Sequence, residues 1–510
     1  MKRSNQKGVA LLITLILVLV LSVMAASMMF LAQSETWSSL NYRLMTQARY
    51  GAEAGLHAAA NYITNPATGY PGIGASDPIT AYNINVSPVT ASGNPVVLSS
   101  LSGVSANYPV SSVKTAFAGA STGTLSAGAS SVNYTTSAKL LSMRQFLQCG
   151  NDQPLTAQLW KLTSHGDITG VRNAEVEVSA LLESHAVPCY NYAAFATGSG
   201  CGAINWSGGG PIDSYDSSTA SGGTVAVQAY DGNIGSNGNA NLAPQTSITG
   251  NFSSPQTGVG ACSAGDAISG ATPSTIQNYV KDCQTSATSC GTTYQVKLPQ
   301  SVQVATPVTS FPTGVVASSL TSPNGNVSPN GCGGAPATGC YGDMNNTFTL
   351  QPYVNPVTNV CSGAKYYINT ISMNGGKTLS IAPCPTGSIG AGSYQPIVVN
   401  VVDVNNTSTP IDIGGGSIAN ASLNPAYLQI QYAGTGNVKV HGGSTAAAVI
   451  FAPNAPVELD GANSSWYGAL MVNTLKLNGN GASIHYDRRL ANTVATLGNW
   501  TIDTFTWSKY

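Results

Sequence analysis

An uncharged apolar segment near the start of the chain restricts its fold more than any other feature. Residues 9–32 read VALLITLILVLVLSVMAASMMFLA and contain no charged side chain. At about 1.5 Å per residue, a helix of this length is roughly 36 Å long, which is enough to cross the apolar core of a bilayer. Lys2, Arg3 and Lys7 precede the segment. This charge distribution predicts that the N-terminus stays in the cytoplasm and that the rest of the chain is exported.

The helical pattern continues beyond the apolar segment. Residues 33–63 keep Ala, Leu and Tyr at helical spacing, are interrupted only by Gly51 and Gly55, and are followed by Pro66. A cleaved secretory signal and a plain membrane anchor are the simplest alternatives. The apolar segment is longer than that of a typical cleaved signal. We therefore expect one helix to about residue 63, roughly 80 Å long at about 1.5 Å per residue.

The composition of the chain favours an extracellular protein rich in turns. Of the 510 residues, only 8% are charged, and the net charge is -1. Soluble domains usually carry about 25% charged residues. Gly, Ser, Thr and Asn are abundant, as is typical of short strands joined by turns. Without a basic excess, we expect no nucleic-acid partner.

The cysteines favour disulfides over a metal site. None forms a CxxC pair, and few histidines lie nearby to complete a zinc set. Their even number is typical of disulfides in an oxidising compartment. Cys332 with Cys340, and Cys361 with Cys384, are plausible local pairs, while the other pairings stay open. The candidates are Cys149, Cys189, Cys201, Cys262, Cys283, Cys290, Cys332, Cys340, Cys361 and Cys384.

After the helix, two kinds of β-structure are expected. Residues 157–183 contain two alternating runs around a turn, which predicts a β-hairpin. Later runs that begin at Tyr427, Ala447 and Tyr467 are 20 residues apart, each with short apolar strands and Gly- or Asn-containing turns. A fixed period of about 20 residues is typical of a stacked solenoid. We favour a right-handed parallel β-helix, with a β-sandwich as the alternative.

The expected fold class is α+β: a long N-terminal helix, a small antiparallel sheet, and a β-helix with a Cys-rich insertion. The insertion is inferred because its residues are rich in Pro and Cys and lack the repeat. The expected division is 1–8 leader, 9–65 transmembrane helix, 66–190 globular region with the hairpin, 191–260 first part of the β-helix, 261–365 insertion, 366–490 main β-helix, and 491–510 C-terminal strand.

Candidate catalytic and ligand-binding residues are few in this sequence. A polysaccharide hydrolase needs two nearby carboxylates, for which Asp213 and Asp216 are candidates. Aspartates are also common in turns, where they accept bonds from the local backbone, and we favour that role. His441 and His485 are too few for a metal site, and residues 231–239 lack the acidic ligands of a calcium loop. We expect no enzyme activity, no metal and no cofactor.

Several motifs resemble those of a known family. The N-terminal stretch QKGVALLITLILVLVLSV, followed by Glu35, Asn41, Arg43 and the run AEAGL at 52–56, resembles the N-terminal domain of PilX-type minor pilins. The later motifs PIDSYDSS, YGALMVNTLKLNG and IHYDRRL resemble the β-helix-like domain found behind such leaders. The resemblance implies that a prepilin peptidase cuts between Gly8 and Val9 and that the new N-terminus is methylated.

One position departs from the family pattern. Major pilins usually carry Glu at the fifth position after the cut, where this chain has Ile13. That carboxylate is thought to pair with the ammonium of a neighbouring subunit, because an unpaired buried charge is costly. The departure fits a rare subunit at a filament tip, although Ile13 is also compatible with a lipid-facing position. Glu53 follows Arg49 by four residues and is interpreted as a helix-surface pair or a subunit contact.

The resulting expectation is a minor type IV pilus subunit, present in the inner membrane before assembly and on the cell surface afterwards. Its expected partners are other pilins, the prepilin peptidase, and a tip adhesin or further minor pilins. The alternatives are a major filament subunit, a pseudopilin of type II secretion, and a membrane-tethered polysaccharide-binding or polysaccharide-degrading protein.

Overall fold

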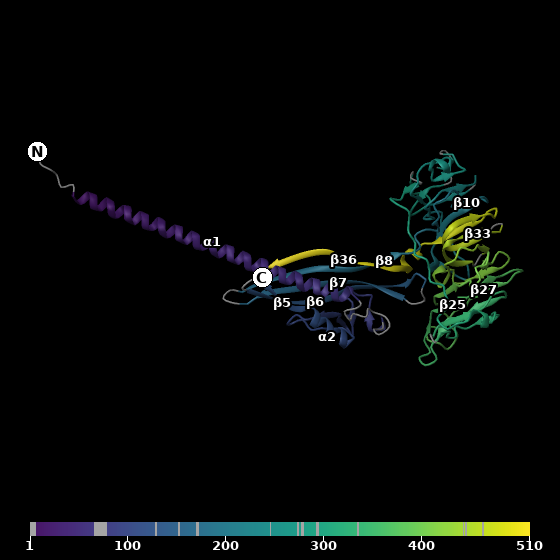
Figure 1. Cartoon of the computed structure of the whole chain (residues 1–510), viewed down its shortest axis with the longest axis horizontal. Coiled ribbons are helices and arrows are strands. Elements are labelled where there is room, and N and C mark those ends of the chain that lie inside the picture. The colour runs from purple at the N-terminus through teal and green to yellow at the C-terminus, as the bar shows by residue number, and fades with distance from the viewer. Residues whose placement is uncertain are drawn as a thin grey trace. The chain divides into compact units, whose positions relative to one another are not determined.

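The structure is a computed structural model with an α+β fold and two compact units (Figure 1). The first unit combines Met1–Arg144, Thr156–His185 and Gly498–Tyr510, and the second combines Gln145–Leu155 and Ala186–Leu497. The residues described are 7–65, 79–127, 130–150, 154–169, 173–244, 246–272, 275–276, 280–291, 295–333, 336–441, 443, 446–461 and 464–509.

The first unit consists of a long helix on a mostly antiparallel sheet. The sheet has the strand order β36-β8-β7-β6-β4, and β5 also pairs with β6. The helices and strands of the first unit are α1 (Lys7–Thr64), η2 (Ile79–Ala81), β1 (Tyr82–Asn83), β2 (Thr90–Ala91), β3 (Asn94–Pro95), β4 (Val97–Ser99), α2 (Ser111–Ala120), β5 (Thr122–Ala127), β6 (Ser130–Gln148), β7 (Pro154–Ile168), β8 (Ala174–Pro188) and β36 (Val494–Lys509).

The single long helix expected from the sequence is confirmed as α1. One face of its second half is buried at a spacing of three or four residues, which is the period of a helix side that packs on one surface. Figure 1 shows these later turns of α1 beside the strands β6 and β7. The buried residues include Leu44, Ala48, Ala52, Leu56, Ala59 and Ile63.

Strands β7 and β8 form an antiparallel hairpin in the segment where alternation predicted one. Their pairing runs from Leu159↔Glu183 to Ile168↔Ala174. Alternate side chains such as Trp160 and Leu162 are fully buried in the core shared with α1. The strand period of two residues thus separates a face that packs on the helix from a polar face.

The second unit is built mainly from one sheet of 19 short strands, together with smaller sheets. The strands of the large sheet are β9 (Ala194–Ala196), β10 (Ile204–Trp206), β11 (Pro211–Tyr215), β12 (Ile234–Ser236), β13 (Ala240–Leu242), β14 (Ser247–Ile248), β15 (Phe252–Ser254), β16 (Ile268–Ser269), β19 (Gln295–Lys297), β21 (Thr338–Tyr341), β25 (Ala364–Ile368), β26 (Ile371–Ser372), β28 (Ile397–Val401), β29 (Ile411–Asp412), β31 (Leu428–Tyr432), β32 (Val438–His441), β33 (Ala447–Asp460), β34 (Ser465–Leu477) and β35 (Ser483–Asp487).

The remaining elements of this unit are short. A four-stranded parallel sheet has the order β20-β22-β27-β30, and two hairpins pair β17 with β18 and β23 with β24. Their bounds are β17 (Asp282–Cys283), β18 (Cys290–Gly291), β20 (Gly325–Val327), β22 (Phe348–Leu350), β23 (Tyr353–Val354), β24 (Cys361–Ser362), β27 (Thr378–Ile381), β30 (Ser417–Ala419), η3 (Ser217–Thr219), η4 (Cys262–Ala264), η5 (Ala317–Ser319), η6 (Pro425–Tyr427) and α4 (Leu490–Thr493).

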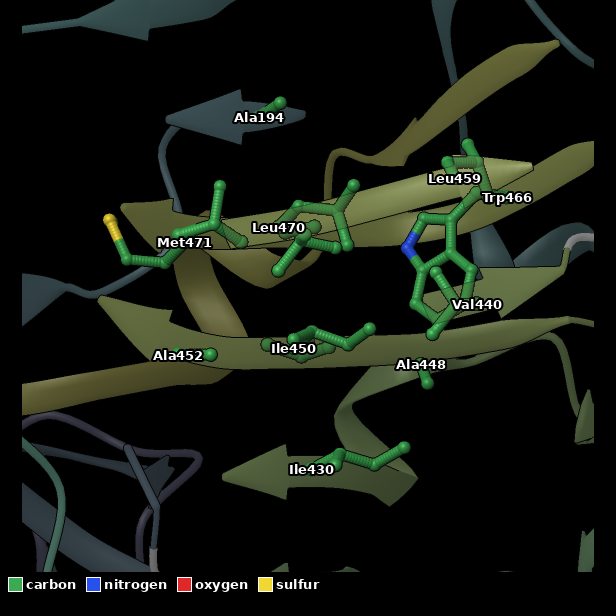
Figure 2. Packing of buried hydrophobic residues seen from close by; sticks show 14 of the residues in the cluster. Ala194, Ile430, Val440, Ala448, Ile450, Ala452, Leu459, Trp466, Leu470 and Met471 are labelled. Atoms are coloured by element: carbon green, nitrogen blue, oxygen red, sulfur yellow. The ribbon is translucent and has the colours of Figure 1, made fainter. Parts of the chain in front are cut away.

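The 20-residue repeat is visible as the register between successive parallel strands. Gln429 pairs with Val449, and Val449 pairs with Ala469, so each step advances the chain by 20 residues. Ile430, Ile450, Leu470 and Ala194 form one buried column across β31, β33, β34 and β9 (Figure 2). Stacking of like residues at each step therefore builds the core of this unit.

The order of the strands in the stack differs from their order in the sequence. Strand β34 pairs with β9 through Leu470↔Ala194, and β35 pairs with β11 through Ile212↔Ile484. The opposite edge of β9 pairs with β12. The path through the stack is therefore β21-β25-β28-β31-β33-β34-β9-β12-β15-β19, with the last strands in sequence placed against the first.

A strand-free segment, residues 298–319, connects the two ends of this stack. Asn237 beside β12 exchanges two bonds with the backbone of Val302, at 2.7 and 2.9 Å. Asn454 in β33 donates to Thr306 at 3.2 Å, and Tyr367 in β25 meets the Phe311 ring. The segment therefore passes from the β12 level across β33 to the β25 level, along the outside of the strands.

This arrangement corrects the expected insertion over residues 261–365. Strands β16, β19 and β21 lie in that range, and β25 begins in it, yet all four belong to the 19-stranded sheet. The sequence pattern does not indicate these strands, because they are two to five residues long and are surrounded by Pro, Gly and Cys. The part of this range that resembles an insertion is the connecting segment at residues 298–319.

Candidate functional site

The first half of α1 presents an apolar surface that the described residues of its own unit leave exposed. Val9, Leu19 and Phe30 expose 62%, 61% and 74% of their surface. The helix is long and apolar enough to cross a membrane, with a mean hydropathy of 3.0 in its most apolar window. Burying each such side chain is worth about 1.5–3 kcal/mol, so this surface strongly favours a lipid or protein environment.

The few hydroxyl groups on this surface are compatible with such an environment. Thr14 donates to the carbonyl of Leu11 at 2.9 Å, and Ser27 donates to that of Val23 at 2.8 Å. A hydroxyl that bonds to its own helix leaves no unsatisfied donor in an apolar surrounding. These hydroxyl groups therefore add no unsatisfied hydrogen-bond donor to the apolar surface.

The predicted processing and assembly residues all lie on this one helix. Gly8 and Val9 are in its first turn, and the Ile13 side chain is 58% exposed within the apolar surface. Glu35 and Arg43 follow on the exposed part of the helix, before the first buried residue. The structure thus places them along one surface without bringing them into contact with one another.

Glu53 lies where the helix begins to pack on the sheet. Its carboxylate meets the Arg49 guanidinium at 2.8 Å, the i,i+4 ion pair expected from the sequence. The Arg49 guanidinium also lies 5.7 Å from the centre of the Trp507 ring on β36. With Arg49 side-chain exposure at 42%, the ion pair itself contributes little to stability.

A set of small residues positions the helix on the sheet. A Cβ atom added to Gly166 of β7 would overlap the backbone of Ala48 and lie 2.5 Å from the Ala52 nitrogen. A Cβ added to Gly55 would lie 2.8 Å from the Thr136 hydroxyl oxygen. The helix and strand therefore touch through their main chains, which larger residues would prevent.

The glycines in this contact explain part of the family-like motif at residues 52–56. Beneath Gly55, the hydroxyl of Thr136 on β6 donates to that of Ser164 on β7 at 2.9 Å. Both hydroxyls are fully buried, and the bond satisfies them where no water reaches. Sequence reasoning recorded Gly51 and Gly55 as breaks in the helical pattern and missed that they are the contact points.

All ten cysteines are paired within the second unit. The structure joins Cys332 with Cys340 and Cys361 with Cys384, the two local pairs considered plausible from the sequence. The other three disulfides are Cys149–Cys189, Cys201–Cys262 and Cys283–Cys290.

The two candidate carboxylates have different hydrogen-bond partners. Asp216 accepts bonds from the backbone and hydroxyl of Ser218, at 2.9 and 2.6 Å, and caps the short helix η3. The hydroxyl bond of Ser218 lowers the pKa of Asp216. Asp213 has a different partner, the His485 ring, at 2.5 Å. Asp216 therefore has the turn role expected of it, whereas Asp213 has a partner that the sequence did not suggest.

Asp213, His485 and Ser483 form a connected polar network. The second ring nitrogen of His485 lies 3.0 Å from the Ser483 hydroxyl, which donates to Ser465 at 3.0 Å. This is the connectivity of a hydrolase triad. However, the three residues expose only 5–7% of their surface. The network joins strands β11 and β35 and is interpreted as structural.

The two histidines considered from the sequence lie on different strands. His441 pairs in register with Asp460, whereas His485 pairs with Asp213. Within the described residues, no group of three His, Cys, Asp or Glu side chains is arranged to hold a metal ion.

Comparisons with known proteins identify two parts of the chain. Residues 7–57 match the PilX N-terminal family, and residues 398–493 match a domain of unknown function, DUF7305. The comparison with curated proteins gave no match. Among solved structures, the competence-associated pilin ComZ from Thermus thermophilus is similar at 12% identity, with 74% of this chain and 84% of that chain covered and a TM-score of 0.21. This TM-score is too low to support an argument about the fold. The family match covers the helix described above, and it confirms that the chain carries the N-terminal segment of PilX-type minor pilins.

Proposed function

We propose that this chain is a non-enzymatic minor subunit of a bacterial type IV pilus, located at the filament tip. The observation that carries the proposal is the division of α1 into an exposed apolar half and a half held against a sheet by main-chain contact. Such a helix fits first into a membrane and then into a bundle of similar helices. The match of residues 7–57 to the PilX N-terminal family supports this use.

In this proposal a prepilin peptidase cuts the chain after Gly8 and the new N-terminus at Val9 is methylated. The inner membrane holds the subunit until the apolar residues of α1 pack against other pilins. The second unit is then displayed outside the cell. Its five disulfides suit that oxidising environment.

We further propose that the second unit is a right-handed parallel β-helix that serves as a tip head. Its parallel strand pairings and its 20-residue register steps support the β-helix. The right hand is inferred because connections between parallel strands are almost always right-handed. Adhesion, or docking of an adhesin and other minor pilins, is the role proposed for this head.

The tip location rests on Ile13 and on the size of the second unit. Without a carboxylate at Ile13, α1 cannot pair with the ammonium of a neighbouring subunit, and it lacks a contact that bulk subunits use for register. The second unit holds Gln145–Leu155 and Ala186–Leu497, a large domain to repeat along a filament wall. Both features favour a subunit that is added once.

Processing is tested by replacing Gly8 with Ile in the full chain. We expect a protein that keeps Met1 and remains in the membrane, as determined by mass spectrometry of the N-terminus and by fractionation. Ala10→Ile is the matched control, because it places the same side chain two residues later and leaves the cut site intact. Normal processing of the Gly8 variant would disprove the leader.

Location is tested by counting labelled subunits on isolated filaments. We expect label at one filament end for the natural chain, and label along the filament for Ile13→Glu. Ile16→Glu is the control, because this residue is 51% exposed on the same helix but does not occupy the fifth position. Label along the whole filament for the natural chain would favour a major subunit.

A further inference from the structure

The last strand of the first unit has one free edge. Strand β36 pairs with β8 along one side, and its first two residues also pair with β6, at Val494↔Leu147 and Ala495↔Gln148. Among the described residues, no strand pairs with the opposite edge of β36 from residue 498 onward. The backbone groups there are available for a further strand.

The orientation of β36 follows from its side-chain contacts. Thr501 bonds to His185 at 2.9 Å and Thr506 to Ser179 at 2.8 Å, both on the polar face of β8. Trp500 and Trp507, each next to one of these threonines, lie on the other face, where Trp500 packs on the core and Trp507 meets Arg49 of α1. The α1 side of β36 is therefore its apolar side.

The C-terminal part of β36 carries exposed apolar side chains. Ile502, Phe505 and Trp507 expose 43%, 43% and 56% of their surface. All residues from 501 to 508 are exposed. Three large apolar side chains near the end of β36 thus have a large part of their surface open.

Natural proteins usually protect an open edge strand with Pro, a charged residue or a short length. Residues 499–509 of β36 contain no Pro or Gly, and their only charges are Asp503 and Lys509. Aromatic and β-branched residues, which favour strands, make up most of the segment. The edge is therefore suited to accept another strand rather than to repel one.

We propose that the free edge of β36 pairs with an edge strand of the neighbouring pilin subunit in the filament. This inference rests on the proposed function. It is supported by continuity, because Trp507 contacts Arg49 on α1, the helix through which subunits would assemble. A neighbour held by α1 is thus brought to the side of the sheet where the edge is open. Main-chain bonds would supply the pairing, and the exposed apolar side chains would supply the contact surface.

The strand that pairs with β36 is a different strand of the neighbouring subunit, not that subunit's own β36. Subunits whose helices run parallel in a filament are related by rotation and translation, so one surface meets another rather than its own copy. Two β36 strands therefore do not meet. The partner strand belongs to a pilin of the same filament and carries apolar side chains at alternate positions to face Phe505 and Trp507.

A photo-crosslinking amino acid placed at Phe505 of the full chain tests the proposal in assembled filaments. We expect adducts whose peptides, determined by mass spectrometry, come from a strand of another pilin subunit. The same probe at Val357, which is 91% exposed in the second unit, controls for random capture. Adducts only within the same chain, with β36 of a second copy, or with a protein that is not a pilin would overturn the proposal.

A probe at Leu19 separates this proposal from the proposed function. Adducts of pilins at Leu19 but not at Phe505 would retain the pilus role and reject the edge contact. Absence of pilin adducts at both positions would reject the pilus role as well. Phe505→Lys should reduce filament incorporation roughly tenfold, whereas Val357→Lys should leave it unchanged. Equal incorporation of both variants would contradict the edge contact.

Discussion

Gly166 of β7 lies so close to Ala48 of α1 that a Cβ atom at Gly166 would overlap the Ala48 backbone. The contact joins the helix of the pilin-like segment to the central hairpin of its sheet. It fixes where the apolar half of α1 extends beyond the sheet, because the helix is buried only from Leu44 onward.

Gly166→Ala should therefore destabilise the first unit. Inserting a methyl group into a packed contact typically costs about 1–3 kcal/mol, and backbone atoms cannot move aside as a side chain can. The measurement is thermal unfolding of the full chain in detergent, followed by limited proteolysis of α1. Gly119→Ala is the matched control, since a Cβ there meets no atom within 4 Å and Ala favours the helix α2. Equal unfolding temperatures for both variants would contradict the tight contact.

Much of α1 could be predicted from the sequence because its signals are local. The uncharged residues 9–32 and the later helical period specify one helix, and the structure has it from Lys7 to Thr64. The reason for Gly51 and Gly55 could not be predicted, because it lies in β6 and β7, which approach the helix only after folding.

In the second unit, too, contacts between residues far apart in the sequence could not be predicted. The 20-residue spacing of strands such as those around Gln429 and Val449 is visible in the sequence and reappears as register. The pairing of Leu470 with Ala194 leaves no such signal, because it joins the two ends of a segment of nearly 280 residues. The polar network of Asp213 and His485 could not be predicted for the same reason, since its members meet only where β11 pairs with β35.

His485→Ala should destabilise the second unit strongly. The change leaves the Asp213 carboxylate, which is 7% exposed, without its ring partner. A buried acceptor left without its hydrogen-bond partner typically costs about 1–3 kcal/mol, and a charged one costs more. Equilibrium denaturation of the full chain, with disulfides intact, measures the loss. His185→Ala is the control, because that side chain is 46% exposed and its pair with Glu183 should be worth less than about 1 kcal/mol. Similar losses in the two variants would argue against the buried network.

The disulfides should differ in their contribution according to the loops they close. Cys201–Cys262 spans 61 residues and Cys332–Cys340 spans 8. Chain-entropy arguments give about 4 kcal/mol for the longer loop and about 2.5 kcal/mol for the shorter. Replacing each pair by two serines and comparing the unfolding midpoints of the second unit measures the difference. A greater loss for the shorter loop would show that local contacts outweigh the entropy of the unfolded chain.

Asp487→Asn should change how stability depends on pH. Burial raises the pKa of Asp487 above its ordinary value of 3.8, although its carboxylate accepts bonds from the Ser217 and Arg489 backbones. The folded state therefore holds the proton more tightly than the unfolded state. The stability gained from this is fully present below pH 3.8 and is lost as the pH rises through the folded pKa. An Asn side chain does not titrate and loses no stability in this way. As the pH rises from acidic to neutral, the variant should therefore become more stable relative to the natural chain. Unfolding midpoints measured across this range check the slope, and parallel curves for the two proteins would refute it.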